Sequence, residues 1–192
     1  YSECTTDNHR KLIVELINQF KYLSNDEYAK ILRELAEDIV TDPELTDETT
    51  QIVAMAVDRA ADSSQYILYG LKPNLQKIGW CNSKYKQVNT AGKAWDTYKN
   101  SPNHKHIVLV DEFVGSGKSV IERVELIQKT FREKNISDYS IRAKVLVATQ
   151  QGIENIESKE INISSRITLK KGISDYYPNY LVNDMLGLMV LE

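Results

Sequence analysis

One stretch of the chain decides the fold: His106-Ile107-Val108-Leu109-Val110-Asp111-Glu112-Phe113-Val114-Gly115-Ser116-Gly117-Lys118-Ser119. Residues 106–110 are almost entirely apolar, which is the pattern of a central parallel strand buried on both faces. The apolar residues that follow Ser119 recur at helical spacing up to Phe131. A strand, a glycine-rich loop and a helix in this order can bind an anion. The glycines let backbone amides converge, and the helix N-terminus carries partial positive charge.

Strands and helices alternate after this stretch. The sequence predicts a strand over 139–149, a short helix after Gln150, a strand over 161–169 and a final helix after Pro178. Such alternation predicts an α/β fold with a mostly parallel, twisted sheet flanked by helices. In sheets of this kind, ligands bind beyond the carboxyl ends of the strands.

The first sixty residues show helical periodicity instead. Apolar residues spaced by three and four predict helices over 9–23, over 31–40 and after Asp47 up to residue 60. We therefore expect an N-terminal helical layer over 1–60, packed on an α/β core over 61–192, in a single domain.

The pattern changes again at Gln65. The β-forming residues from Gln65 to Tyr69 predict a strand, and Gly70 and Pro73 predict a loop after it. Residues 76–106 show no clean periodicity and are expected to form a long, partly irregular excursion.

Composition excludes several classes of protein. The 192 residues include 24 Lys and Arg against 27 Asp and Glu, a net charge of -3, which lacks the basic excess typical of proteins that bind nucleic acid through bulk charge. Cys4 and Cys81 have no metal-ligand or disulfide spacing, so a reducing, cytoplasmic setting is expected. No apolar run approaches the roughly 20 residues of a membrane helix. Because Tyr1 replaces an initiator Met and the chain stops inside an apolar run, we expect it to be a piece of something longer.

Two phosphate-binding motifs compete for residues 111–119. The Walker A loop requires Gly-x-x-x-x-Gly-Lys-Ser/Thr, and counting back from Gly117 places Glu112 where the first glycine must be. A P-loop ATPase also needs a magnesium-holding acid after a later apolar strand, but the strand at 145–147 continues into Ala148-Thr149-Gln150. Both observations weigh against a P-loop.

The other motif fits at every position: four apolar residues, two adjacent acids, two spacers and a loop of small residues. It resembles the phosphoribosyl-diphosphate-binding signature of type I phosphoribosyltransferases. The resemblance implies catalytic Asp111 and Glu112 beside the ribose hydroxyls, and Mg²⁺ bound together with phosphoribosyl diphosphate or a nucleotide. It also implies a phosphate-binding loop made of Gly115, Ser116, Gly117, Lys118 and Ser119. The residue types suit these roles, because carboxylates accept from hydroxyls whereas amides and hydroxyls donate to phosphate.

The same resemblance extends to two further segments. It places a pyrophosphate loop one strand upstream, at Gly70, Leu71 and Lys72, and a base-binding segment near the C-terminus, at Asp175 and Tyr176. Together with Gly172-Ile173-Ser174-Asp175-Tyr176-Tyr177, the motif is similar to a branch of phosphoribosyltransferase-like proteins predicted to act as effectors in bacterial conflict systems, including anti-phage defence. This likeness covers roughly residues 60–192. The alternative for the C-terminal segment is a capped turn with packed tyrosines.

Three functions remain open at this stage. The first is an enzyme, either a phosphoribosyltransferase or an N-glycosidic hydrolase, that works with other products of a defence operon. The second is a catalytically silent module that senses a nucleotide, which a packed-away rather than strained Gly70-Leu71 peptide would favour. The third binds single-stranded nucleic acid through the lysines and aromatic residues of 76–106, for which a solvated surface anchored by its aromatics is the simpler interpretation. None of the three involves a membrane.

Overall fold

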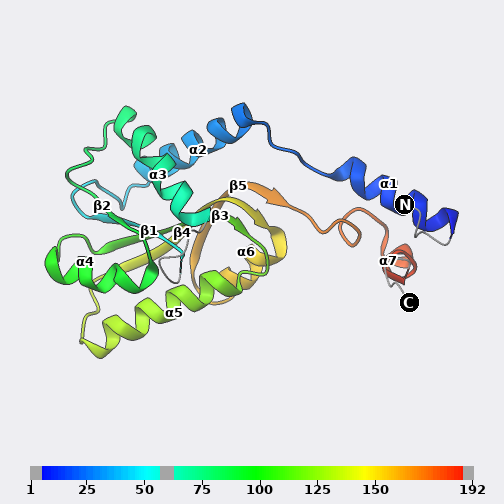
Figure 1. Ribbon diagram of the computed structural model, residues 1–192. Helices are drawn as coiled ribbons and strands as arrows, with labels where there is room; N and C mark the ends of the chain where they lie inside the picture. The colour runs from blue at the N-terminus through cyan, green and yellow to red at the C-terminus, as the bar shows by residue number, and fades with distance from the viewer. Residues whose placement is uncertain (1–5, 57–62, 188–192) are drawn as a thin grey trace. The chain divides into compact units, whose positions relative to one another are not determined.

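The computed structural model describes residues 6–56 and 63–187 (Figure 1). The chain divides into two compact units, which we call the core unit, residues 25–169, and the terminal unit, residues 1–24 with 170–192. Along the core unit run α2 Asn25–Val40, β1 Thr50–Ala54, α3 Ser63–Lys77, β2 Lys86–Val88, the 3-10 helix η1 Ala91–Lys93, α4 Ala94–Asn100, β3 His106–Val114, α5 Lys118–Glu133, β4 Ser140–Thr149, α6 Gln150–Glu157 and β5 Asn162–Leu169. The terminal unit holds α1 Asp7–Gln19 and α7 Asn179–Gly187.

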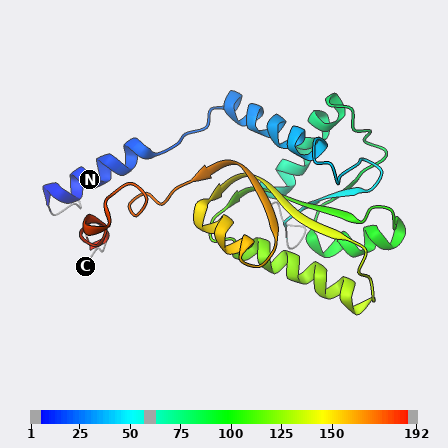
Figure 2. The same cartoon turned by 180° about the vertical axis from the view of Figure 1, so that it is seen from behind.

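The five strands form one parallel sheet in the order β2-β1-β3-β4-β5. The expected α/β fold is therefore confirmed. Helices α2 and α3 cover one face of the sheet, and α4, α5 and α6 cover the other (Figures 1 and 2). After β1, the chain adds β2 on one side and then crosses over to add β3 on the other side. The carboxyl ends of β1 and β3 therefore flank the crevice in which doubly wound sheets bind ligands.

Each face of the sheet carries its own apolar core. On the α5 face, the sheet packs against Val124, Ile127 and Phe131, all at most 2% exposed. On the opposite face, the fully buried side chains come from α2 and α3: Leu35, Ile39, Ile67, Leu68, Leu71 and Leu75. Burying a side chain of this size contributes about 1.5–3 kcal/mol, so these two layers hold the strand ends in place.

A buried ionic network joins the end of α2 to β4. Arg142 donates to Asp42 over 2.7 Å, and Lys144 lies 3.0 Å from Asp38 and 3.2 Å from Asp42. The Arg142 and Lys144 side chains are only 8% and 9% exposed. Burial alone would raise the pKa of Asp42, but the hydrogen bonds from Arg142 and Lys144 outweigh it and hold this pKa below its ordinary value. The network fixes the C-terminal end of α2 to the sheet.

The helix predicted after Asp47 is wrong, because residues 50–54 form strand β1. All five side chains of β1 are buried, since the strand lies between β2 and β3 and is covered on both faces. A strand buried on both faces shows no alternation, so helical spacing can be found among its apolar residues by chance. The predicted part from residue 57 to 60 lies outside the described residues.

The strand predicted over 65–69 and the loop over 70–74 are also wrong, because both lie inside helix α3. Gly70 sits where α3 meets α2, and a Cβ at this position would lie 2.7 Å from a methyl group of Leu32. Pro73 stands inside the helix, and the side chain of Asn74 donates to the Gly70 carbonyl over 2.9 Å. Tertiary packing thus overrides the local signals of glycine and proline.

Residues 76–106 are more regular than expected, since they contain β2, η1 and α4. Trp80 and Tyr85 are buried, at 7% and 3% exposure. Trp95 and Tyr98 pack on Phe131 with ring centroids 5.4 and 5.1 Å apart. The four rings serve packing, as the simpler interpretation holds, and they are not an open surface for stacking bases.

Helices predicted near both ends of the chain are confirmed by α1 and α7. In the terminal unit, Thr6 caps α1 by accepting from the His9 amide, and the Tyr177 hydroxyl donates to Glu15. None of the helices within the described residues combines the length and the apolar character that crossing a bilayer requires.

Candidate functional site

The predicted strand, loop and helix are confirmed as β3, residues 115–117 and α5. The strand continues four residues beyond the expected end, to Val114, because Asp111, Phe113 and Val114 pair with β4 there. Gly117 then turns the chain into α5 with φ at 80°, a left-handed conformation that favours glycine. A Cβ on Gly117 would also lie 2.8 Å from the Gly152 carbonyl oxygen. Only glycine satisfies both conditions.

Helix α6 holds the carbonyl groups of this loop. Thr149 Oγ1 donates to the Gly115 carbonyl over 2.6 Å, and Asn155 Nδ2 donates to the Ser116 carbonyl over 3.0 Å. Thr149 also caps α6 by accepting from the Gly152 amide over 2.9 Å. The loop is therefore fixed through its carbonyl groups on the side that faces α6.

The other side of the loop offers hydrogen-bond donors to a ligand. Ser116, Lys118 and Ser119 are exposed, and the one side-chain contact to an amide in the first turn of α5 in the described part of the chain is a 3.5 Å hydrogen bond that Ser116 Oγ accepts from the Lys118 amide. Within residues 6–56 and 63–187, the amides of Ser116 and Gly117 donate to no acceptor. Lys118 keeps its charge available, because its only ion pair in that part of the chain is to Glu122 at 3.8 Å, with the lysine side chain 80% exposed. This arrangement suits a phosphate group.

The two acids lie at the end of β3, just before the loop. Both are partly exposed. Asp111 Oδ1 accepts from the Glu112 amide over 2.8 Å and from Ser63 Oγ over 3.5 Å. Ser63 is the first residue of α3, so the acidic pair lies between the phosphate-type loop on one side and α3 on the other. The structure therefore brings Asp111 and Glu112 together with Gly115, Ser116, Gly117, Lys118 and Ser119.

The chain that leaves β1 is fixed next to these residues. The Met55 amide donates to the Val110 carbonyl over 3.3 Å, and Arg123 Nε of α5 donates to the Met55 carbonyl over 3.1 Å. The Arg123 side chain is only 17% exposed. Arg123 thus sets the direction in which the chain leaves β1 at the switch point.

Three predicted residues do not form the loop assigned to them. Gly70, Leu71 and Lys72 lie inside α3, and Leu71 is completely buried, so these residues form no pyrophosphate loop. The connection from β1 to α3, at residues 55–62, occupies that place in the topology, and its residues 57–62 lie outside the described part of the chain.

Asp175 and Tyr176 belong to the terminal unit, whereas the other predicted site residues belong to the core unit. Asp175 accepts from the Lys171 amide over 2.7 Å and closes a turn, and Tyr176 is 53% exposed. A capped turn is one of the two interpretations that the sequence left open for this segment.

Sequence reasoning missed Thr149, Gly152, Asn155 and Arg123. Two of them carry a local signal, because a threonine before a helix is a common cap and a glycine inside a short helix marks a close approach. Asn155 and Arg123 carry none, since their partners lie 39 and 68 residues away in the sequence.

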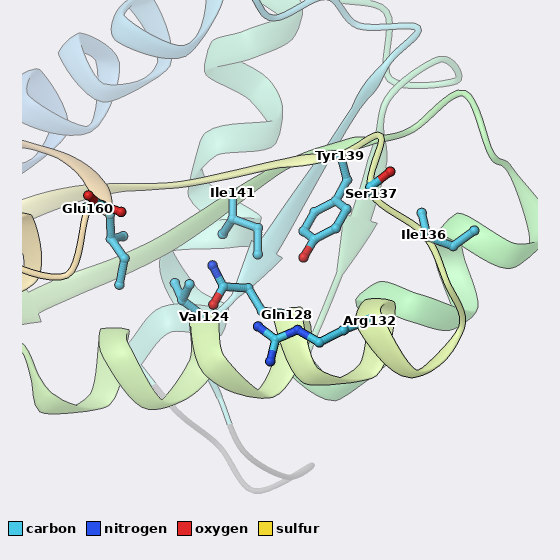
Figure 3. A pocket seen from close by; sticks show the side chains of 9 residues that line it. Val124, Gln128, Arg132, Ile136, Ser137, Tyr139, Ile141 and Glu160 are labelled. Carbon is cyan, nitrogen blue, oxygen red and sulfur yellow. The ribbon is translucent and has the colours of Figure 1, made fainter.

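A separate pocket lies between α5 and the start of β4 (Figure 3). Its volume is about 400 Å³, and its lining includes Gln128 and Arg132 of α5 together with Tyr139 and Ile141. In Figure 3, the Tyr139 hydroxyl points toward the helix from which Gln128 and Arg132 extend. None of the acidic-pair or loop residues lines it, so it is distinct from the site at the end of β3.

The comparison with protein families decides what kind of protein this is. The PRTase-CE family model matches residues 5–181, which is most of the chain. The chain belongs to the PRTase-CE family. This membership agrees with the motif at 110–119 and with the parallel sheet of the fold. The sequence of this PRTase-CE protein matches none of the curated proteins.

Solved phosphoribosyltransferases share low sequence identity with this PRTase-CE protein. Orotate phosphoribosyltransferase from Aeropyrum pernix has 18% identity and a TM-score of 0.46, over 85% of this chain and 78% of that one. Hypoxanthine-guanine phosphoribosyltransferase from Schistosoma mansoni, solved with IMP, has 13% identity and a TM-score of 0.49, over 79% and 67%. A hypothetical protein from Neisseria gonorrhoeae with bound ppGpp has 14% identity and a TM-score of 0.46, over 86% and 92%. The assignment of this chain rests on its family match and strand order.

Proposed function

We propose that this protein binds a 5-phosphoribosyl compound, either phosphoribosyl diphosphate or a nucleotide, and acts on its anomeric carbon. The observation that carries the proposal is the adjacency of the acidic pair and the anchored loop. The acids can accept from the two ribose hydroxyls while the amides and hydroxyls of 115–119 bind the 5-phosphate. The two groups lie on consecutive segments, as a ribose 5-phosphate requires.

In the proposed reaction, a nitrogen or water nucleophile forms a bond to the anomeric carbon as the bond to pyrophosphate or to a base breaks. Positive charge develops on the ribose ring during this exchange. The carboxylates of Asp111 and Glu112 stabilise that charge, and the loop fixes the far end of the sugar. Positioning and electrostatics therefore supply the catalysis, and no nucleophilic side chain is needed.

The residues present fit a magnesium ion that arrives with the ligand. Magnesium prefers oxygen ligands and is usually held by one or two carboxylates together with substrate phosphates. Asp111 and Glu112 provide two carboxylates, and the described residues contain no group of three or more acidic, His or Cys side chains that would form a complete cage. Bound there, the ion would neutralise diphosphate charge.

The biological role that we propose is that of a cytoplasmic effector in a bacterial defence system, acting with other products of its operon. The motif similarity and membership of the PRTase-CE family support it. The alternative is a catalytically silent module that binds a nucleotide in the same place and regulates a partner. Gly70 and Leu71 are packed inside α3, which is the outcome that favours this alternative.

Titration calorimetry with phosphoribosyl diphosphate and Mg²⁺, with ATP in a parallel run, tests the proposal. We expect saturable binding of phosphoribosyl diphosphate that disappears when Ser116→Ala and Ser119→Ala are combined. A preference for ATP, or binding that ignores both substitutions, would contradict the proposed site. Release of pyrophosphate or free base from a bound compound would then separate the enzyme from the sensor.

A further inference from the structure

Two tyrosines lie beside the acidic pair and are used neither by the phosphate loop nor by the proposed reaction. Tyr66 is one turn into α3, whose first residue, Ser63, contacts Asp111. Tyr28 is in the first turn of α2, and its ring packs on Tyr66 with centroids 6.0 Å apart and planes tilted by 40°. The two helices therefore present one aromatic pair next to the end of β3.

The pair has one half-buried member, Tyr28, and one open member, Tyr66. Tyr66 is 65% exposed, although it belongs to a helix whose other side is fully buried. The Tyr28 hydroxyl is buried, and among the described residues no group forms a hydrogen bond with it. Burial, followed by the charges of Glu112 and Tyr66, raises the pKa of Tyr28. Tyr28 thus stays neutral close to Glu112. Its ring packs against the ring of Tyr66 and limits the movement of that exposed side chain.

A ligand whose phosphate lies in the loop would have its anomeric end near the Tyr66 ring. The loop at 115–117 leans on α6, which follows β4, whereas α3 packs on β1 and β3 at the other side of the acidic pair. A sugar phosphate with its phosphate in the loop and its hydroxyls on Asp111 and Glu112 therefore extends its anomeric substituent toward α3. An exposed tyrosine there would meet that substituent.

We propose that Tyr66, backed by Tyr28, stacks the heterocyclic base of a nucleotide whose ribose 5-phosphate lies on the acidic pair and the loop. This inference rests on the proposed function and narrows its ligand class to compounds that carry a base. Stacking needs only a π face, so purine and pyrimidine nucleotides are both accommodated. Tyr66 sets the choice between a nucleotide and a bare sugar phosphate.

The test compares AMP, UMP and ribose 5-phosphate by calorimetry at fixed Mg²⁺ concentration. We expect both nucleotides to bind about 5- to 150-fold more tightly than ribose 5-phosphate, which is the range for one stacked base. Tyr66→Ala should reduce AMP and UMP to the affinity of ribose 5-phosphate, while Tyr66→Phe should keep the advantage. Tyr69→Ala is the matched control, because Tyr69 is 59% exposed on the same helix, one turn further from the acidic pair.

Each outcome separates this inference from the proposed function. Equal affinities for AMP and ribose 5-phosphate, or a nucleotide advantage that survives Tyr66→Ala, would overturn the stacking role. The proposed function would still stand if ribose 5-phosphate bound and lost its affinity in the variant with Ser116→Ala and Ser119→Ala. Failure of all three compounds and of phosphoribosyl diphosphate to bind would contradict both. Folding of each variant is checked by its thermal transition, which the exposed positions should leave unchanged.

Discussion

Replacing Gly152 by alanine would displace the candidate phosphate loop without touching any group that contacts the ligand. A Cβ on Gly152 would lie 2.1 Å from the Gly115 carbonyl oxygen and 3.1 Å from Thr149 Oγ1. Because real contacts of this kind stay above 3.0 Å, the loop and α6 must separate by about 1 Å. This breaks the 2.6 Å hydrogen bond from Thr149 to Gly115.

The cost of this change can be worked from its parts. Overpacking costs about 1–3 kcal/mol, and the lost hydrogen bond about 0.5–1.5 kcal/mol. Alanine regains about 0.5–1 kcal/mol over glycine in a helix. The net destabilisation is then about 0.5–4 kcal/mol, which lowers Tm by about 1–16 °C at this chain length.

The effect on binding should be of the same order as the effect on stability. A loop that moves by about 1 Å takes at least one amide out of hydrogen-bonding range of a phosphate. A hydrogen bond to a charged group is worth about 1.5–3 kcal/mol, so the affinity for ribose 5-phosphate should fall by about 10- to 150-fold.

Calorimetry and thermal unfolding of Gly152→Ala would measure both quantities. Gly92→Ala is the control, since a Cβ on Gly92 meets nothing within 4 Å. Wild-type affinity and wild-type Tm for Gly152→Ala would refute the conclusion that α6 holds the loop in its binding conformation.

Three further predictions concern the acids, the ionic network and the aromatic pair. Combining Asp111→Asn with Glu112→Gln removes two charges at nearly constant volume, so turnover or Mg²⁺-dependent ligand binding should be lost with folding intact, as measured by calorimetry and circular dichroism. Arg142→Met leaves Asp42 buried without its main partner, so the free energy of unfolding in urea should fall by about 3–5 kcal/mol. Because the folded-state pKa of Asp42 lies below 3.8, its contribution is present above about pH 4 and is lost as the pH falls further, and Arg142→Met should weaken that acid sensitivity. Tyr28→Phe removes a buried hydroxyl without a partner in the described structure, so the same unfolding assay should show unchanged or greater stability.

Each of these predictions has an outcome that would contradict it. Wild-type turnover in the doubly substituted acid variant would remove both acids from the mechanism. An Arg142→Met protein with unchanged stability would mean that the ionic network is only an accessory to apolar packing. Clear destabilisation by Tyr28→Phe would show that the phenol has a hydrogen-bond partner in solution.

The central part of the fold could be predicted because its signals are contiguous. In residues 106–119, the buried strand, the acids, the loop and the helix start follow one another, so the candidate site could be read in a single pass. The elements around it could not, because they depend on partners far away in the sequence. Strand β1 is buried along its whole length because it lies inside the sheet, between β2 and β3.

Helix α3 shows the opposite failure. Its tyrosines, Gly70 and Pro73 favour a strand and a loop when read locally. The helix forms because Leu68, Leu71 and Leu75 are buried in the layer with α2, which outweighs the local cost of glycine and proline. The support of the loop by Thr149 and Asn155 likewise depends on the order of β3, β4 and α6, which no local pattern specifies.

The ionic network at the end of α2 has a mechanical consequence. Asp38 fixes that end of the helix to Lys144, while Tyr28 lies ten residues away, a separation of about 15 Å along a helix. Helix α2 is therefore fixed at its C-terminal end by the ion pair and carries Tyr28 near its N-terminal end. A tilt of about 4° at the ion pair moves Tyr28 by about 1 Å, given that length. Substitutions among these distant charges that tilt α2 would therefore move Tyr28 and, through it, the Tyr66 ring on which the proposed stacking depends.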